Sequence, residues 1–226
     1  MMVVLIPKVS QAIGTYVYQS PSKIAFNAAI EEEVIQHGDS HNPDDPHYNA
    51  LKDSVLKVHQ VKDVTDLPFN YGGLVMQRGE KITSNIYNKH HQQLLNQYRK
   101  QNQLTRFLAL INPYLAIKNL SMAICGTDFE SYINFQQQAE KYRYALAQKM
   151  NELQIKYISP KKVSGSEGKK HVISREEWKA LPDFEHQHLS IAKVLQNEII
   201  SIVSILIWFL LSFLLLIRQS KIAKAI

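Results

Sequence analysis

Hydrophobic positions in this chain recur at helical spacing over long stretches, and one stretch near the end is apolar on every side. Residues from Ile199 to Ile217 form a run of 19 without a charged side chain. An α-helix rises about 1.5 Å per residue, so this run nearly matches the roughly 30 Å hydrocarbon core of a bilayer. A buried core helix is the alternative, but helices apolar all round are rare outside membranes. The pattern predicts a transmembrane helix over residues 198–218.

The charges that flank this run indicate its orientation. Glu198 precedes the run, and Arg218, Lys221 and Lys224 follow it without an acidic residue among them. Basic residues next to a spanning helix favour the cytoplasmic side. Residues 219–226 are therefore predicted to be a basic cytoplasmic tail, and residues 10–197 an extracytoplasmic domain.

A second apolar segment opens the chain but is short. Met1 to Ile6 cannot span a bilayer alone. A signal peptide is disfavoured, because no basic region precedes these residues and no small-residue cleavage site follows them. We interpret residues 1–9 as the end of a truncated transmembrane helix.

Between these segments, apolar residues at intervals of three and four predict helices, and no stretch alternates as a strand does. The fold class is therefore expected to be all-α, a bundle of long helices with a C-terminal transmembrane helix. The predicted helices cover about 26–37, 47–58, 74–110, 113–124 and 127–155. Turn-forming residues predict loops over 38–47 and 161–170, and residues 184–196 are expected to lead directly into the spanning helix.

Particular residues are expected to set the boundaries of these helices. Asn112 is a predicted N-cap, and Pro113 suits the first helical position, where no backbone donor is needed. The helix that follows is apolar on most sides, so we expect it to be buried, and Gly126 is expected to end it. Thr127 and Glu130 form a predicted capping box at the start of the next helix.

Composition narrows the possible functions. The chain has 26 Lys and Arg against 20 Asp and Glu, a mild excess that is spread out and does not favour nucleic acid as a partner. Its one cysteine, Cys125, excludes an internal disulfide, and the apolar setting predicts a buried structural thiol.

Few residues in the sequence suggest a catalytic, metal-binding or phosphate-binding site. Histidines and acids gather in one predicted loop, where imidazole and carboxylate groups would suit zinc, but their spacing matches no strong metal-binding pattern. The metal candidates are His37, Asp39, His41 and His47. Gly165 to Lys170 resembles a phosphate loop superficially but lacks its first glycine, its Ser or Thr and its preceding strand. We expect no enzyme activity and no bound cofactor.

A larger set of residues carries a family resemblance. These residues are Asn112, Pro113, Ser121, Met122, Gly126, Thr127, Asp128, Phe135, Glu140, Arg143, Trp178 and Pro182. Their order resembles the extracytoplasmic region of bacterial ABC-2-type transporter permeases, a domain of unknown function called DUF3526. We interpret these residues as setting the fold, and Trp178 as suited to the headgroup level of a membrane.

The resemblance implies a function. The chain would be a permease component of an ABC-type transporter in the bacterial inner membrane, and a C-terminal portion of such a permease, because permeases of this kind have several spanning helices. ATP would be bound and hydrolysed by a separate ATPase subunit. The remaining permease helices or a second permease chain would complete the path, and the outer domain would cap it or dock substrate or partners.

Two other hypotheses stay open at this point. The first is a single-span, membrane-anchored extracytoplasmic module that binds or senses a ligand. The second is a metal-dependent enzyme that uses the loop from His37 to His47.

Overall fold

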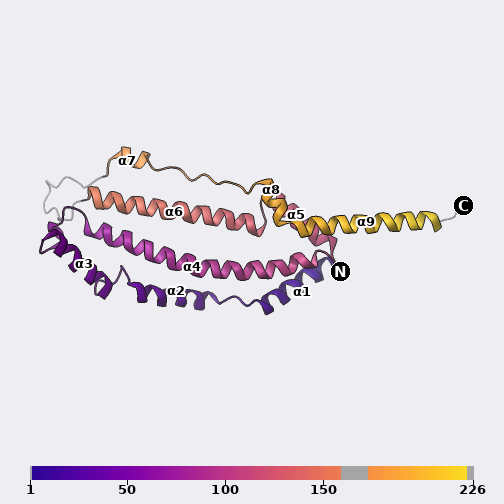
Figure 1. The fold of residues 1–226 in the computed structure, drawn as a ribbon, viewed down its shortest axis with the longest axis horizontal. Coiled ribbons are helices and arrows are strands. Elements are labelled where there is room, and N and C mark those ends of the chain that lie inside the picture. Colours follow the sequence, from indigo (N-terminus) through magenta and orange to yellow (C-terminus); the bar gives the residue numbers. More distant parts are fainter. Residues whose placement is uncertain (1, 159–172, 223–226) are drawn as a thin grey trace. The chain divides into compact units, whose positions relative to one another are not determined.

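The computed structural model describes residues 2–158 and 173–222. These residues form helices and no strand, which confirms the all-α fold class. The predicted lysine-rich loop at 161–170 and the last residues of the basic tail lie outside the described residues. The helices are α1 (Met2–Val17), α2 (Lys23–His37), α3 (Pro46–His59), a 3-10 turn (Val64–Asp66), α4 (Tyr71–Leu108), α5 (Pro113–Ile124), α6 (Phe129–Tyr157), α7 (Arg175–Lys179), α8 (Ile191–Asn197) and α9 (Ile199–Ile222) (Figure 1).

Capping residues explain where several helices begin and end. The Asn112 side chain accepts a hydrogen bond from the backbone N–H of Tyr114, and Pro113 takes the first position of α5, as predicted. Gly126 then has a φ of 68°, and the backbone N–H of Thr127 donates to the Met122 carbonyl. This pairing satisfies the last carbonyls of α5, so Gly126 ends the helix as predicted.

The prediction that Thr127 caps the start of α6 is wrong. Asp128 caps the helix, because its carboxylate accepts hydrogen bonds from the backbone N–H groups of Glu130 and Ser131. Thr127 instead donates its hydroxyl to the Met122 carbonyl, at the end of α5. Thr127 therefore completes the turn after α5, and the helix start moves one residue along the chain.

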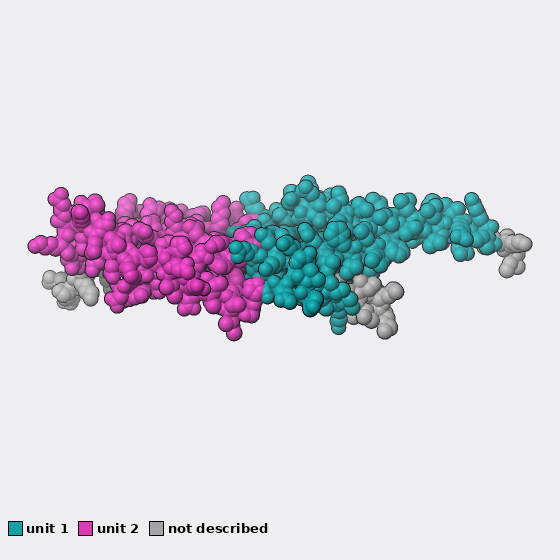
Figure 2. Space-filling model, turned by 60° about the horizontal axis from the view of Figure 1, so that its bottom comes forward, with its two compact units in different colours: residues 1–20, 93–137, 186–226 teal, residues 21–92, 138–185 magenta. Residues whose placement is uncertain are grey.

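The helices belong to two compact units (Figure 2). Unit 1 comprises residues 1–20, 93–137 and 186–226, and unit 2 comprises residues 21–92 and 138–185. Both α4 and α6 contribute to each unit. Unit 1 also holds α1, α5, α8 and α9, whereas unit 2 holds α2, α3 and α7.

In unit 2 the first part of α4 packs antiparallel to the last part of α6. The Gln148 side chain donates to the backbone carbonyl of Gln77, and the Arg143 guanidinium contacts Glu80 one turn further on. A Cβ at Gly73 would lie 2.8 Å from a side-chain carbon of Ile155 and 3.0 Å from its backbone nitrogen. A glycine at this position therefore lets the two helices approach closely.

The core of unit 1 lies where α4, α5 and α9 meet. Ala109, Leu115 and Ala116 are buried there, and Leu108 and Ile205 pack against them. The prediction that α5 is buried holds for one side only. Its other side exposes Ile117 and Ile124, because the apolar residues of α5 surround the helix while its neighbours cover a single face.

Residues 184–196 do not lead directly into the last helix, contrary to the prediction. The chain is extended through residue 189, Ser190 caps the short helix α8, and α9 begins only after Glu198. The Ser190 hydroxyl accepts from the backbone N–H of Lys193, which starts a helix where a continuous one was expected.

Candidate functional site

Glu198 lies at the junction of α8 and α9 in unit 1. Its backbone N–H donates to the carbonyls of Val194 and Leu195, and its own carbonyl accepts from the N–H of Ile202. Glu198 therefore ends one helix and begins the next. Its side chain is only 2% exposed, although the sequence suggested a charge at the edge of the apolar run.

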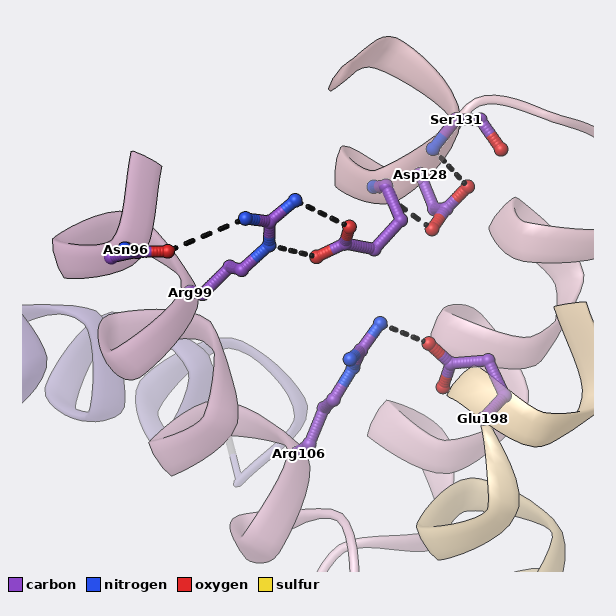
Figure 3. A network of polar contacts seen from close by, with 7 residues as sticks. Asn96, Arg99, Arg106, Asp128, Ser131 and Glu198 are labelled. Carbon is purple, nitrogen blue, oxygen red and sulfur yellow. Dashed lines mark hydrogen bonds and ion pairs between the residues drawn. The ribbon is translucent and has the colours of Figure 1, made fainter. Parts of the chain in front are cut away.

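A buried ion pair explains how this carboxylate is accommodated. The Arg106 guanidinium of α4 donates to Glu198 Oε1 at 2.6 Å (Figure 3), and the Ser201 hydroxyl donates to Oε2 at 2.7 Å. Removing a carboxylate from water is costly unless a counter-charge and hydrogen bonds compensate it. Both oxygens of Glu198 have such a partner, so the start of α9 is fixed to the end of α4.

Two further contacts continue along the same side of α9. The Ser204 hydroxyl donates to the Ala109 carbonyl at 2.6 Å, and Trp208 Nε1 donates to the Leu110 carbonyl at 3.0 Å. Ser201 and Ser204 are fully buried. Two of the three serines in the apolar run therefore bond to Glu198 and to the turn that follows α4, whereas the third, Ser212, is exposed.

The remainder of α9 has a different environment. Residues 209–222 are exposed, and only 11% of the most apolar 18-residue window of this helix is buried. In Figure 1 this end of α9 extends beyond the other helices of unit 1. Within the described residues, α9 is the one helix whose length and composition suffice to cross a membrane. An exposed surface this apolar is suited to lipid.

A second ion pair holds α4 to the start of α6. Arg99 lies seven residues before Arg106, and its Nε and Nη2 donate to the two carboxylate oxygens of Glu130 at 3.1 and 3.2 Å (Figure 3). Such a bidentate pair fixes the orientation of both side chains. The Asp128 cap lies beside it in Figure 3, so this face of α4 positions both α6 and the start of α9.

A hollow of about 430 Å³ opens beside α5 and α8 in unit 1. Apolar residues and two histidines form its wall, and the Nδ1 atom of His186 is buried without a hydrogen-bond partner. Its lining includes Ile124, Cys125, Asn134, His186, His188 and Leu195. Cys125 is exposed, so the prediction of a buried thiol is wrong. Cys125 directly precedes Gly126, where the chain leaves α5, and its side chain is left exposed there.

Unit 2 holds two clusters of charged side chains. Lys89 and His90 of α4 contact the Glu33 carboxylate at 2.8 Å each. The hydrogen bonds from Lys89 and His90 lower the pKa of Glu33. Arg143 contacts Glu80 at 2.7 Å and Glu140 at 2.8 Å, and hydrogen bonds from Glu140 and then Glu80 raise the pKa of Arg143. These contacts join helices and gather no reactive group.

The predicted metal candidates do not assemble into a metal centre. His37 Nδ1 contacts the backbone carbonyl of Glu33, and His41 pairs with Asp39 on the surface. Asp45 accepts from the backbone N–H groups of Asp39, His47 and Tyr48, and the Asp39 N–H makes the largest contribution to lowering the Asp45 pKa. Across the described residues, no three His, Cys, Asp or Glu side chains gather in a metal-binding group. The carboxylate of Asp45 thus holds the loop together through three backbone hydrogen bonds.

The residues that carry the family resemblance lie in both units. Asn112, Pro113, Gly126 and Asp128 set helix ends, and the aromatic ring of Phe135 contacts His186 edge to face. In unit 2, Tyr142 donates to the Pro182 carbonyl, and Trp178 is exposed.

The other members of this set are mostly exposed. Ser121 and the Met122 side chain lie on the surface of α5, where the Met122 carbonyl accepts from Thr127. The interpretation of the whole set as fold-setting residues and the placement of Trp178 at lipid headgroups both stay predictions.

No pattern in the sequence indicates that Glu198 is buried or that it pairs with Arg106. Arg106 lies 92 residues before it along the chain, and no local spacing links the two residues. A charged residue directly before an apolar run is ordinarily assigned to the solvent. Tertiary packing in unit 1, where the end of α4, α5 and α9 meet, brings Arg106 to the junction.

Comparison with known proteins identifies one family. No curated protein and no solved structure matches the chain. The family described as "Domain of unknown function (DUF3526)" matches residues 23–187, which is most of the chain. The chain therefore belongs to the DUF3526 family.

Proposed function

We propose that this chain is the permease component of an ABC-type transporter, anchored by α9, with its DUF3526 region on the extracytoplasmic side. The observation that carries the proposal is the exposed apolar surface of α9, which follows the family region after a short segment that contains α8. The resemblance of Asn112 to Arg143 to ABC-2-type permeases supports the transport role. The ATPase would be a separate subunit, and further permease helices or a second chain would complete the path.

The buried contacts of α9 suit such a role. The pair of Arg106 with Glu198 couples the start of α9 to α4, and the bonds of Ser204 and Trp208 couple it to the turn after α4. A movement of the spanning helix would then be transmitted to the helices of unit 1. Packed helices that shift together are a common route for conformational switching, and such a shift would suit ATP-driven transport.

The first test is the isolation of the chain from its own membrane in mild detergent. We expect an ATPase subunit to copurify with it. The matched control carries Leu211→Asp and Leu214→Asp, which place two charges in α9 and prevent its insertion. Recovery of the unaltered chain from the membrane without any ATPase would contradict the transporter proposal.

The second test measures the orientation with the single cysteine. Cys125 is exposed, so a membrane-impermeant maleimide added to spheroplasts should label it if the DUF3526 region lies outside. The control is Cys125→Ser with Ser220→Cys, which moves the thiol to the other end of α9 and should be labelled only after permeabilisation. The reverse labelling pattern would overturn the proposed orientation.

One observation favours a second candidate, a membrane-anchored binding or sensing module without a transport role. The hollow beside α5 and α8 has the size of a small-molecule site, an apolar lining and an unpaired ring nitrogen of His186. A fluorophore attached to Cys125 would lie at its wall. We expect a small apolar probe to change the emission of this label, and His186→Phe to weaken the response; an unchanged emission would count against a ligand site.

A further inference from the structure

The turn between α4 and α5 exposes apolar side chains. Residues 107–117 carry no charge, and Arg106 and Lys118 bound them. We call residues 107–117 the apolar turn. Its exposed side chains are Phe107, Leu110, Ile111, Tyr114 and Ile117. Several exposed apolar side chains gathered on one turn indicate a surface that contacts another protein or a membrane.

The contacts with α9 show beside which part of this helix the apolar turn lies. Ser204 donates to the Ala109 carbonyl and Trp208 to the Leu110 carbonyl. Ser204 and Trp208 are the fifth and ninth residues after Ile199, so they lie about 8 and 14 Å along the helix axis. The apolar turn therefore lies beside the first half of the apolar run, as Figure 1 also shows.

The backbone of the apolar turn has few polar groups left for water. The Leu108 carbonyl accepts from the N–H groups of Ile111 and Asn112, and the two carbonyls that follow accept from α9. The Asn112 side chain accepts from the Tyr114 N–H, and Pro113 has no N–H to satisfy. Backbone inside a bilayer is stable only when its polar groups are paired in this way.

We propose that the apolar turn inserts into the same leaflet that α9 enters, as a second membrane contact that does not span the bilayer. Lipid would cover the exposed side chains of the apolar turn, because the anchored α9 would hold the turn at the level of the hydrocarbon core. Exposed Lys118 would then lie at its edge, where its ammonium suits headgroup phosphates. The inference rests on the proposed anchoring of α9 in the membrane.

A quenching experiment on the full chain tests this insertion. Cys125→Ser removes the native thiol, and Ile111→Cys carries an environment-sensitive fluorophore in vesicles of phosphatidylcholine and phosphatidylglycerol. Spin-labelled lipid is then added to the vesicles. We expect severalfold stronger quenching at position 111 than for the same label at Gln137→Cys, an exposed site on α6 of the same unit. Ile117→Cys is a second site, should the first variant fold poorly.

A label at Leu214→Cys in α9 distinguishes the two possible failures. Quenching at 214 together with position 111 behaving like position 137 overturns the insertion of the turn and leaves α9 anchored. A label at 111 that is shielded from water yet not quenched means that protein covers the turn, which also overturns the inference. Absence of quenching at 214 overturns the anchoring itself, and the insertion with it.

Discussion

An arginine joins two helices in each unit, and the two arginines lie in different surroundings. In unit 1, Arg106 contacts Glu198, whose side chain is 2% exposed. In unit 2, Arg143 contacts the carboxylates of Glu80 and Glu140, and its own side chain is 51% exposed. Arg143 thus has more charged partners, whereas Arg106 has the more deeply buried one.

The difference shows that burial, more than the number of hydrogen bonds, determines how much an ion pair matters for the stability of the fold. Water can replace the partner of an exposed charge at little cost, so surface ion pairs contribute little to stability. A buried carboxylate that loses its counter-charge has no such replacement. The same substitution at the two arginines should therefore have unequal consequences, and the predictions below test that inequality.

The largest effect is expected for Arg106→Met. The change leaves Glu198 buried with the Ser201 hydroxyl but no counter-charge, and we expect the free energy of unfolding to fall by about 3–5 kcal/mol. Thermal and urea unfolding of the chain in detergent micelles, followed by circular dichroism, would measure it. Lys193→Met, which removes an exposed cation of the same unit, is the matched control and should change little.

The double variant Arg106→Met with Glu198→Gln sharpens the test. It removes both charges, so it should be more stable than Arg106→Met alone, because no unpaired carboxylate remains buried. If the double variant instead loses the sum of the two single effects, the two residues are not coupled, and the contrast with Arg143 has another cause.

An intermediate effect is expected for Asn112→Ala at the apolar turn. The substitution removes the N-cap of α5 but leaves no charge unpaired, so unfolding should become easier by about 1 kcal/mol. Asn112→Ser keeps an acceptor oxygen without adding a charge at this buried position, so it should retain most of the stability in micelles. An Asn112→Ala variant as unstable as Arg106→Met would show that the turn matters for more than its cap.

Much of the fold could be predicted because helix ends depend on local chemistry. Asn112-Pro113 and Gly126 identified α5 from one end to the other, and Gly38 ended α2 as expected. The apolar run from Ile199 likewise identified α9, since its length and lack of charge are properties of one segment. These features need no knowledge of what packs against them.

The candidate site could be predicted only in part because its contacts are not local. Arg106 and Glu198 meet across 92 residues, and the two buried serines of α9 bond to groups that the apolar run alone does not indicate. Cys125 was assigned to the core from its apolar neighbours, although the position beside a left-handed glycine faces outward. In each case the tertiary packing of unit 1 decided what the local pattern left open.

A smaller effect is expected for Arg143→Met in unit 2. Its guanidinium is half exposed, so solvent replaces the contacts to Glu80 and Glu140, and the free energy of unfolding should fall by less than about 1 kcal/mol. The loss should shrink further at high salt, because salt screens exposed charges. A loss equal to that of Arg106→Met would break the comparison, since burial would then not distinguish the two arginines.

The smallest effect should appear only when stability is measured as a function of pH, in the cluster of Glu33, Lys89 and His90, where Lys89 is exposed and Glu33 is 19% exposed. Hydrogen bonds from Lys89 and His90 lower the Glu33 pKa below its usual value of 4.5, so the folded state holds the proton less tightly than the unfolded state. The contribution of Glu33 to stability is then present above pH 4.5 and is lost as the pH falls through the lowered pKa.

Glu33→Gln should lower the melting temperature slightly at pH 7, and the difference from the unaltered chain should close in acid. Glu31→Gln on the exposed face of α2 is the matched control. A difference that stays constant from neutral to acid pH would mean that Glu33 acts through packing and that its charge contributes nothing measurable.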